Sequence, residues 1–175
     1  MKRSHNPRSN SRSTKATTSA PDTARTYHLV DVENLCGSGH PELEELRATL
    51  SSYASSVGLS ATDQGRASMS YYETRRFLFE LPSQLRWVVA GTGHDAADDA
   101  LLFDCDPEHL ASRFNRIVLA TGDHRFAGLA AELRSRGMHV TVAVGKGALA
   151  PMLAAQADEI ISLAELETAL EPSAA

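Results

Sequence analysis

Short, uninterrupted apolar runs recur along the second half of the chain, and they constrain its fold more than any other feature. A run of this kind indicates a strand with both faces buried, which is typical of a parallel sheet covered by helices on each side. Together with two β-rich stretches nearer the start, these runs predict strands at residues 27–32, 67–72, 87–90, 117–120, 140–144 and 160–162.

Helical patterns separate the predicted strands. Pro41 stands in a first helical turn, apolar residues follow at helical spacing as far as Val57, and Gly58 ends the helix. Residues 73–82 are expected to form an irregular connection. Further helices are predicted at residues 95–104, from 107, at 124–136 with Gly137 as the C-cap, from 148, and at 164–170. This alternation predicts an α/β fold, a three-layer α/β/α sandwich around a mainly parallel sheet.

The length of 175 residues fits one domain, but its charge is unevenly distributed. Residues 1–25 carry a net charge of +5 (6 − 1), whereas the remainder carries −10 (11 − 21). We expect residues 1–25 to be a disordered basic leader, because so polar a stretch buries too little surface to offset the entropy of ordering. The folded domain is therefore predicted at residues 26–175. The leader could bind an RNA or DNA backbone by counterion release, although a simply solvated leader is favoured.

The number of cysteines and the length of the apolar runs indicate the cellular compartment. Its two cysteines, Cys36 and Cys105, show neither a disulfide framework nor zinc-ribbon spacing, which fits a reducing, cytoplasmic environment. No apolar run approaches the roughly 20 residues of a membrane helix, and no apolar stretch follows the basic start as in a secretory signal. We therefore predict a cytoplasmic protein without a membrane partner.

Three acidic residues follow predicted strands. Asp31 closes the first strand, Asp98 lies one turn into the helix after the strand at 87–90, and Asp123 follows the strand at 117–120. In an open parallel sheet, functional groups gather outside the carboxyl ends of the strands. Three carboxylates at one edge repel each other unless a cation or protons neutralise them, and hard oxygen ligands favour Mg²⁺ or Mn²⁺. Such an ion can support phosphodiester cleavage, so these aspartates are predicted to be both metal ligands and catalytic residues.

Each acid also has a plainer explanation as a turn or helix-capping residue. Asp95 is best explained as a helix cap. Asp98 is not, because helical spacing places it on the apolar stripe of Leu101 and Leu102, where a carboxylate needs a partner. Asp99 is rotated about 100° away and is predicted to be an auxiliary or solvated acid.

Polar and basic residues near the acids are further candidates. The Asn34 amide is an auxiliary group that could hold a carboxylate or a phosphate oxygen, or form an Asx-turn. Lys146 and Arg125 are candidate substrate-binding cations, although a flexible loop lysine is the commoner explanation for Lys146. Neither assignment is forced by spacing.

Three motifs in order resemble those of the NYN domain, a branch of the PIN-like nuclease superfamily. They are Asp31-Val-Glu-Asn34, Ala96-Ala-Asp-Asp-Ala-Leu101 and Thr121-Gly-Asp-His-Arg-Phe126. The resemblance spans residues 27–163, and it implies a PIN-like α/β/α fold and metal-dependent cleavage of RNA. It also implies that Asp31, Asp98 and Asp123 bind Mg²⁺ or Mn²⁺, and that RNA is the partner, with single strands favoured.

The sequence departs from this family at Arg125, where many members carry a second acid after the Gly-Asp pair. A cation there would lower the affinity for a second metal unless Asp99 or Glu33 compensates. The resemblance thus leaves three outcomes open: a single metal, slow cleavage, or RNA binding without cleavage. A non-catalytic RNA-binding or regulatory module on the same fold is therefore the main alternative. A homo-oligomer or an inhibitory protein partner is also left open.

Two other classes of protein fit less well. Residues 91–96 match the G-x-G-x-x-A pattern of dinucleotide-binding oxidoreductases, but they follow a middle strand and lie among acids that would repel a pyrophosphate. A phosphatase or receiver domain built on Asp31 would have a second aspartate where Glu33 stands. We therefore disfavour both.

Overall fold

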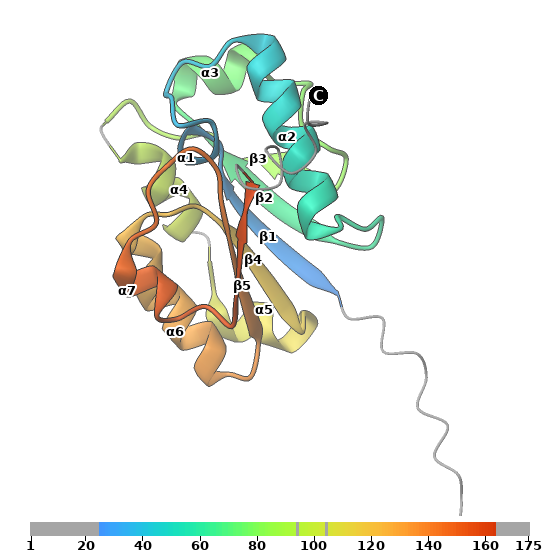
Figure 1. Ribbon diagram of the computed structural model, residues 1–175, viewed down its shortest axis with the longest axis vertical. Helices are drawn as coiled ribbons and strands as arrows, with labels where there is room; N and C mark the ends of the chain where they lie inside the picture. Colours follow the sequence, from blue (N-terminus) through green and yellow to red (C-terminus); the bar gives the residue numbers. More distant parts are fainter. Residues whose placement is uncertain (1–24, 94, 104, 164–175) are drawn as a thin grey trace, which may run out of the picture.

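A single sheet of six parallel strands organises the computed structural model, which describes residues 25–93, 95–103 and 105–163. The strands lie side by side in the order β3-β2-β1-β4-β5-β6 (Figure 1). Their bounds are β1 Thr26–Asp31, β2 Gln64–Ser68, β3 Leu85–Trp87, β4 Arg116–Ala120, β5 His139–Val144 and β6 Glu159–Ser162. The predicted parallel sheet is confirmed.

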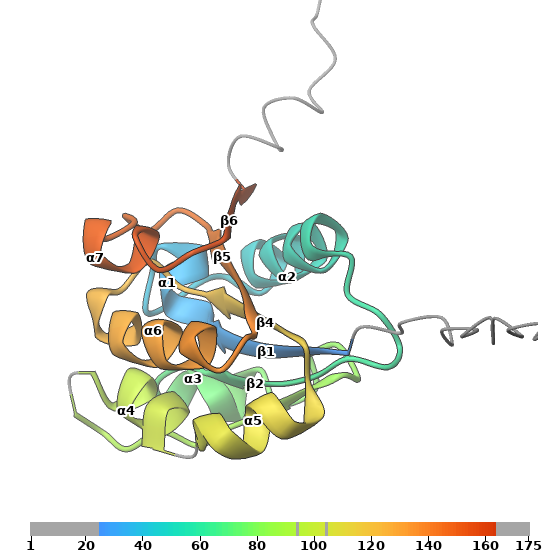
Figure 2. The same cartoon turned by 90° about the horizontal axis from the view of Figure 1, so that it is seen from below.

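Helices cover both faces of this sheet, as the predicted α/β/α sandwich requires. One face carries α1 (Val32–Cys36) and α2 (Leu43–Val57), and the chain beyond α3 (Tyr71–Arg76) packs there through Phe77. The other face carries α4 (Ala96–Phe103), α5 (Pro107–Arg113), the 3₁₀ turn η1 (His124–Phe126), α6 (Ala127–Ser135) and α7 (Pro151–Ala154). Figure 2 shows the layers from the side, with α2 and α5 on opposite sides of the strands.

Successive side chains of the central strands pack alternately into two separate hydrophobic cores. Leu29 of β1 and Ile117 of β4 point to the face of α4, α5 and α6, whereas Val30 and Val118 point to the face of α1 and α2. Successive side chains of a strand alternate between its faces, so strands buried on both sides must be apolar at nearly every position. This requirement explains the uninterrupted apolar runs of the sequence.

Several predicted element ends are confirmed. Gly58 ends α2 in the left-handed conformation, with φ 63°, which costs glycine little because it lacks a Cβ atom. Pro107 and Pro151 occupy the first turns of α5 and α7, where the missing backbone N–H is not needed. The helix predicted from residue 148 therefore begins three residues later, at its proline.

Between residues 64 and 95 the predicted strand bounds are wrong, and one helix was not predicted. β2 ends at Ser68, not at residue 72, because Glu33 Oε1 accepts a hydrogen bond from Ser70 N (2.7 Å) where the chain turns into the unpredicted helix α3. β3 comprises Leu85–Trp87 rather than residues 87–90, and Val89 is exposed. Asp95 has φ 60°, so it does not adopt the extended conformation of an ordinary helix cap.

Two predictions fall on parts of the chain that the structure does not describe. The basic leader, apart from Arg25, and the final helix at 164–170 lie outside the described residues. Among the described residues, no helix is both long and apolar enough to cross a membrane.

Candidate active site

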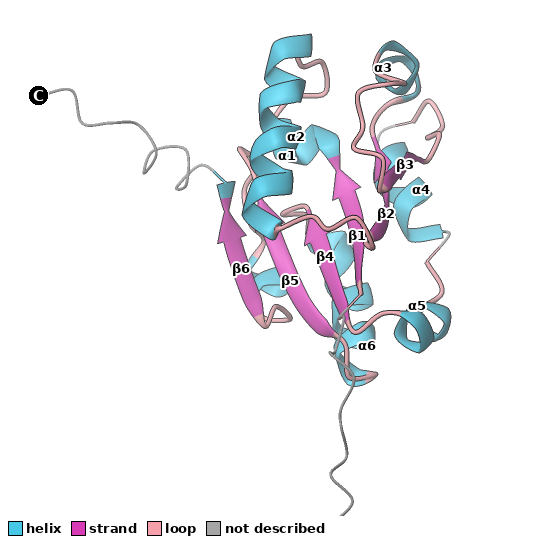
Figure 3. Ribbon diagram, turned by 90° about the vertical axis from the view of Figure 1, so that its right-hand side faces the viewer, coloured by secondary structure: helices cyan, strands magenta, loops and turns pink. Residues whose placement is uncertain are grey.

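The candidate site lies where the strand order reverses, between the carboxyl ends of β1 and β4. After β1 the chain passes to the face of α2, and after β4 it passes to the face of α6, which leaves a crevice between the two strand ends. Figure 3 shows the strands pointing the same way, with α1 beyond the arrowhead of β1. The glycine motif at residues 91–96 follows β3, an outer strand of this sheet, and its residues Gly93, Asp95 and Ala96 reach the acidic edge, where carboxylates would repel the pyrophosphate of a dinucleotide.

Asp31, the last residue of β1, is buried and fixed by two hydrogen bonds. Its Oδ1 atom accepts from Asn34 N at 3.1 Å, which caps α1, and its Oδ2 atom accepts from Thr121 Oγ1 at 3.1 Å. The second bond follows from strand register, since Val30 pairs with Ala120 and the next residues along each strand are Asp31 and Thr121. Thr121 was not among the predicted site residues. Its position directly after a buried strand was the only signal.

Asn34 links its own helix, α1, to the loops of Gly122 and Gly147 at this edge of the sheet. Its side-chain oxygen accepts a hydrogen bond from Gly122 N at 2.8 Å, and its backbone oxygen accepts one from Gly147 N at 3.1 Å. A Cβ atom on Gly147 would lie 2.6 Å from Asn34 Oδ1, closer than contacts allow. The Asn34 amide oxygen therefore accepts a backbone N–H, and its predicted role toward a carboxylate or a phosphate stays a prediction.

Asp98 reaches the same place from α4, which packs on β1 and β2. It is only 8% exposed, as its position on the apolar stripe of the helix predicted. Burial, together with the charges of Asp31 and Asp123, raises the pKa of Asp98 from 3.8 to about 7. Burial also raises the pKa of Asp31, and the charge of Asp31 in turn raises that of Asp98. Both acids line the same hollow.

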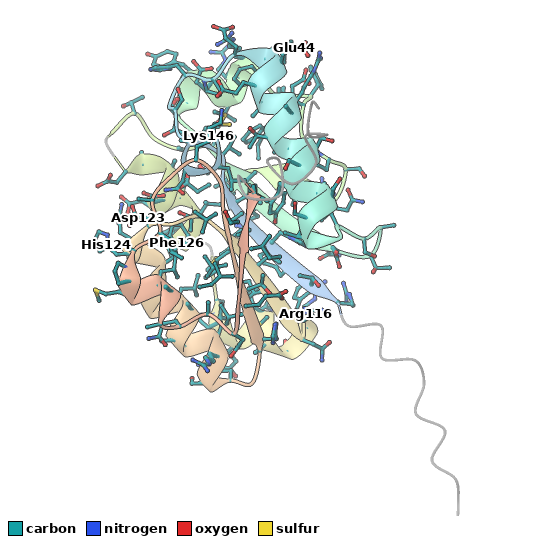
Figure 4. All side chains as sticks on the ribbon, in the orientation of Figure 1. Glu44, Arg116, Asp123, His124, Phe126 and Lys146 are labelled. Atoms are coloured by element: carbon teal, nitrogen blue, oxygen red, sulfur yellow. The ribbon has the colours of Figure 1, made fainter. Side chains whose placement is uncertain are left out.

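Asp123 stands at the rim of the site, directly before η1. Its Oδ1 atom accepts a hydrogen bond from Arg125 N at 2.8 Å, so it caps this turn, and it also lies 3.0 Å from His124 Nδ1. Figure 4 shows Asp123 and His124 together at the outside of the fold, with Phe126 nearby. Phe126 is fully buried and anchors the turn.

Arg125 supplies a positive charge among the acids. Its guanidinium lies 3.6 Å from Asp95 Oδ2 and 3.7 Å from Asp98 Oδ2, and it forms a close ion pair with Asp99. The Arg125 charge lowers the pKa of Asp98, although burial and the neighbouring acids outweigh it. Asp99 itself points outward from α4, as its predicted rotation from Asp98 requires.

One hollow of about 440 Å³ is lined by all three predicted aspartates, Asp31, Asp98 and Asp123. Glu33, Asn34 and Asp95 also line it. As placed, however, no three His, Cys, Asp or Glu side chains in residues 25–93, 95–103 and 105–163 could hold a metal ion together. The Arg125 guanidinium, 3.7 Å from Asp98 Oδ2, neutralises part of the charge of these acids.

The chemistry of the donors nevertheless fits a hard divalent cation. Every predicted ligand supplies carboxylate oxygen, the type of donor that Mg²⁺ and Mn²⁺ prefer. Burial and the neighbouring acids hold the pKa of Asp98 at about 7 in spite of Arg125, so further positive charge in the hollow would favour its ionised form.

Lys146 is not brought into this hollow. Its Nζ atom forms an ion pair with Glu45 Oε1 at 2.7 Å, and the side chain is exposed. In Figure 4 it lies well apart from Asp123 and His124. Gly147, the residue after Lys146, was not singled out in the sequence, but it lies close to Asn34 and contacts it.

The fold and the acidic crevice are those of a PIN-like nuclease-type domain. A family model described as the NYN domain matches residues 25–166, and the chain therefore belongs to the NYN domain family of the PIN-like nuclease superfamily. Comparison with curated proteins finds no match. The crystal structure of a protein of unknown function from Vibrio parahaemolyticus is similar, with a TM-score of 0.55 and 15% identity, covering 82% of this chain and 95% of that one. This likeness supports the fold alone.

Proposed function

We propose that this domain is a ribonuclease that cleaves RNA phosphodiester bonds with the help of Mg²⁺ or Mn²⁺. The supporting observation is the buried Asp31–Asp98 pair, which shares one hollow with Asp123 at the reversal point of the sheet. Structural ion-pair networks can also perturb a pKa, but here the perturbed acids come from separate elements and line a cavity. Membership of the NYN family points to the same reaction.

The three aspartates would hold the cation, which supplies activation of water and stabilisation of charge on the phosphate. Thr121 and the backbone of Asn34 fix the orientation of Asp31 before any ligand binds. Asp98 carries the proton that must leave when positive charge enters the site, because its pKa is about 7. Single-stranded RNA is the favoured substrate, with Arg125 and Lys146 as candidate contacts to its phosphates.

A single-turnover assay on single-stranded RNA with Mg²⁺ or Mn²⁺ tests this proposal. Asp31→Asn and Asp98→Asn should each abolish cleavage while the far-ultraviolet circular dichroism stays unchanged. Asp158→Asn is the matched control, because Asp158 pairs with Arg134 and does not line the hollow of the three aspartates. Turnover like that of the wild type in either site variant would refute the catalytic assignment.

Arg125 favours a second candidate function, a non-catalytic RNA-binding or regulatory module. Its guanidinium already neutralises part of the acid cluster, as a structural cation would. In that case RNA would bind without cleavage, and Asp98→Asn would leave RNA affinity unchanged. The same assay, combined with a binding measurement, separates the two functions.

We also propose that the protein is located in the cytoplasm. Cys36 and Cys105 are both free thiols in the structure, which suits a reducing compartment. Fractionation of the native host with a redox-sensitive thiol label would test it.

A further inference from the structure

A cluster of arginines lines a second hollow, at the amino end of the sheet. This hollow has a volume of about 530 Å³ and is lined by Arg66 of β2, Arg86 of β3 and Arg113 of α5. Figure 3 shows α5 beside the starts of the strands, whereas the acidic site lies beyond their arrowheads. The two hollows therefore lie at opposite ends of the sheet, and they share no lining residue.

The strand register places two of these charges next to each other. Arg66 and Arg86 are paired positions in the β2–β3 ladder, so their side chains leave the same face of the sheet. Arg86 and Arg66 therefore border the same hollow. Within the described parts of the chain, neither Arg86 nor Arg113 forms an ion pair with a carboxylate. The fold therefore brings arginine side chains together at a place where a bound anion would neutralise their charge.

Aromatic rings form one wall of the same hollow. Tyr27 and Phe114 line it with their ring centroids 5.0 Å apart. The guanidinium groups of Arg25 and Arg113 lie 5.0 Å and 5.6 Å from the centroid of Phe114. Arginine stacked on an aromatic ring keeps its N–H donors available at the edge of the guanidinium plane, which suits the oxygens of a phosphate.

The two acids of this hollow are engaged by backbone amides. Asp63 accepts hydrogen bonds from Thr26 N and Ser60 N, and Asp106 accepts them from the first turn of α5. Their charge is therefore partly balanced by N–H donors, and the arginines dominate the field of the hollow.

We propose that this hollow binds a phosphate group, with Arg86 and Arg113 as its principal contacts. The phosphate belongs either to a free nucleotide or to the backbone of an RNA chain, since both present the same anionic oxygens. The volume falls within the range of roughly 300–1,000 Å³ that is usual for small-ligand sites. Binding here goes beyond the proposed cleavage reaction and needs neither a metal nor the three aspartates.

The test measures the binding of two probes, adenosine 5′-monophosphate and a short oligouridylate, by calorimetry in the presence of EDTA. Arg86→Gln and Arg113→Gln should each weaken binding about tenfold, the usual size for loss of one charge-assisted hydrogen bond. Arg47→Gln is the matched control, because it removes the same charge from α2, where Arg47 pairs with Glu80. Thermal melting of each variant verifies that the fold is intact.

Each outcome decides the proposal. Weaker binding of both probes supports a site for a nucleotide phosphate, and weaker binding of the oligouridylate alone supports a site for the RNA backbone. The proposal is overturned if neither probe binds the wild type, or if both site variants bind like Arg47→Gln. The binding is measured in EDTA, where no metal-dependent cleavage takes place, so failure of the cleavage proposal would be recognised separately, in the single-turnover assay.

Discussion

The charge of Asp31 raises the pKa of Asp98, although one residue ends β1 and the other lies on α4. Two carboxyl groups buried beside each other are most stable when one of them carries a proton. In the metal-free protein a proton therefore neutralises part of the carboxylate charge that a bound cation would otherwise neutralise. The predictions about the site depend on this relationship.

The first prediction concerns stability and pH. The pKa of Asp98 is raised from 3.8 to about 7, so the folded protein binds more protons than the unfolded chain between these values. The stability linked to Asp98 is thus fully present below 3.8 and lost as the pH rises through about 7. Asp98→Asn removes this loss. The metal-free variant should be more stable than the wild type at about pH 8, by about 2 kcal/mol, but not at about pH 4.

Urea unfolding in EDTA at these two pH values measures the difference. Asp99→Asn, an exposed neighbour on the same helix, is the control and should show no comparable pH dependence. An equal effect of Asp98→Asn at both pH values would show that the carboxyl group is not perturbed.

The second prediction concerns Arg125, which competes with a metal for the acids. Arg125→Gln should lower the urea midpoint of the metal-free protein, because Asp95, Asp98 and Asp99 lose their positive neighbour. The same change should strengthen Mn²⁺ binding severalfold. Arg134→Gln, which removes an ion pair with Asp158 elsewhere, should leave Mn²⁺ binding unchanged. Weaker Mn²⁺ binding in Arg125→Gln would mean that the arginine supports the metal site.

The third prediction concerns the close approach of Gly147 to Asn34. Gly147→Ala would place a Cβ atom 2.6 Å from Asn34 Oδ1, so the loops must separate. We expect a loss of about 1–3 kcal/mol in stability and reduced cleavage, since Asn34 also positions Gly122. Gly128→Ala on α6 is the control. It meets no atom within 4 Å and should stabilise the helix by about 0.5–1 kcal/mol. Equal stability of Gly147→Ala and the wild type would contradict the structure.

The fourth prediction concerns a buried polar network beneath α2. The hydroxyl of Tyr53 lies 2.7 Å from His28 Nδ1, and His28 Nε2 lies 3.5 Å from Asp63 Oδ2. Tyr53→Phe leaves the buried His28 nitrogen without this partner and should cost about 1–3 kcal/mol. Tyr72→Phe, at a 73% exposed position, should change stability little. Similar unfolding free energies for the two variants would argue against the network.

Much of the fold could be predicted from the sequence because burial on both faces leaves a clear apolar signal. That signal failed in β2, where Gln64, Gly65 and Arg66 are polar or small and the strand borders an open hollow. The helix α3 was missed because its turn depends on Glu33, far back in the chain, holding Ser70 N. Such a tertiary contact has no local signature.

The site was predictable in part for a related reason. Asp31 and Asp123 follow apolar strands, and Asp98 interrupts an apolar stripe, so their places could be inferred from pattern alone. The hydrogen bond from Thr121 and the neutralising contacts of Arg125 depend on the strand register and on α4 lying over β1. Neither contact could be predicted from the spacing of residues along the chain.

Calorimetric titration with Mn²⁺ at about pH 6, in two buffers of different ionisation enthalpy, tests the central claim most directly. If a cation replaces the proton held by Asp98, whose pKa is about 7, the wild type should release about one proton on binding. Asp98→Asn should bind Mn²⁺ far more weakly and release none. Binding of equal strength in the variant, or binding by the wild type without proton release, would contradict the account.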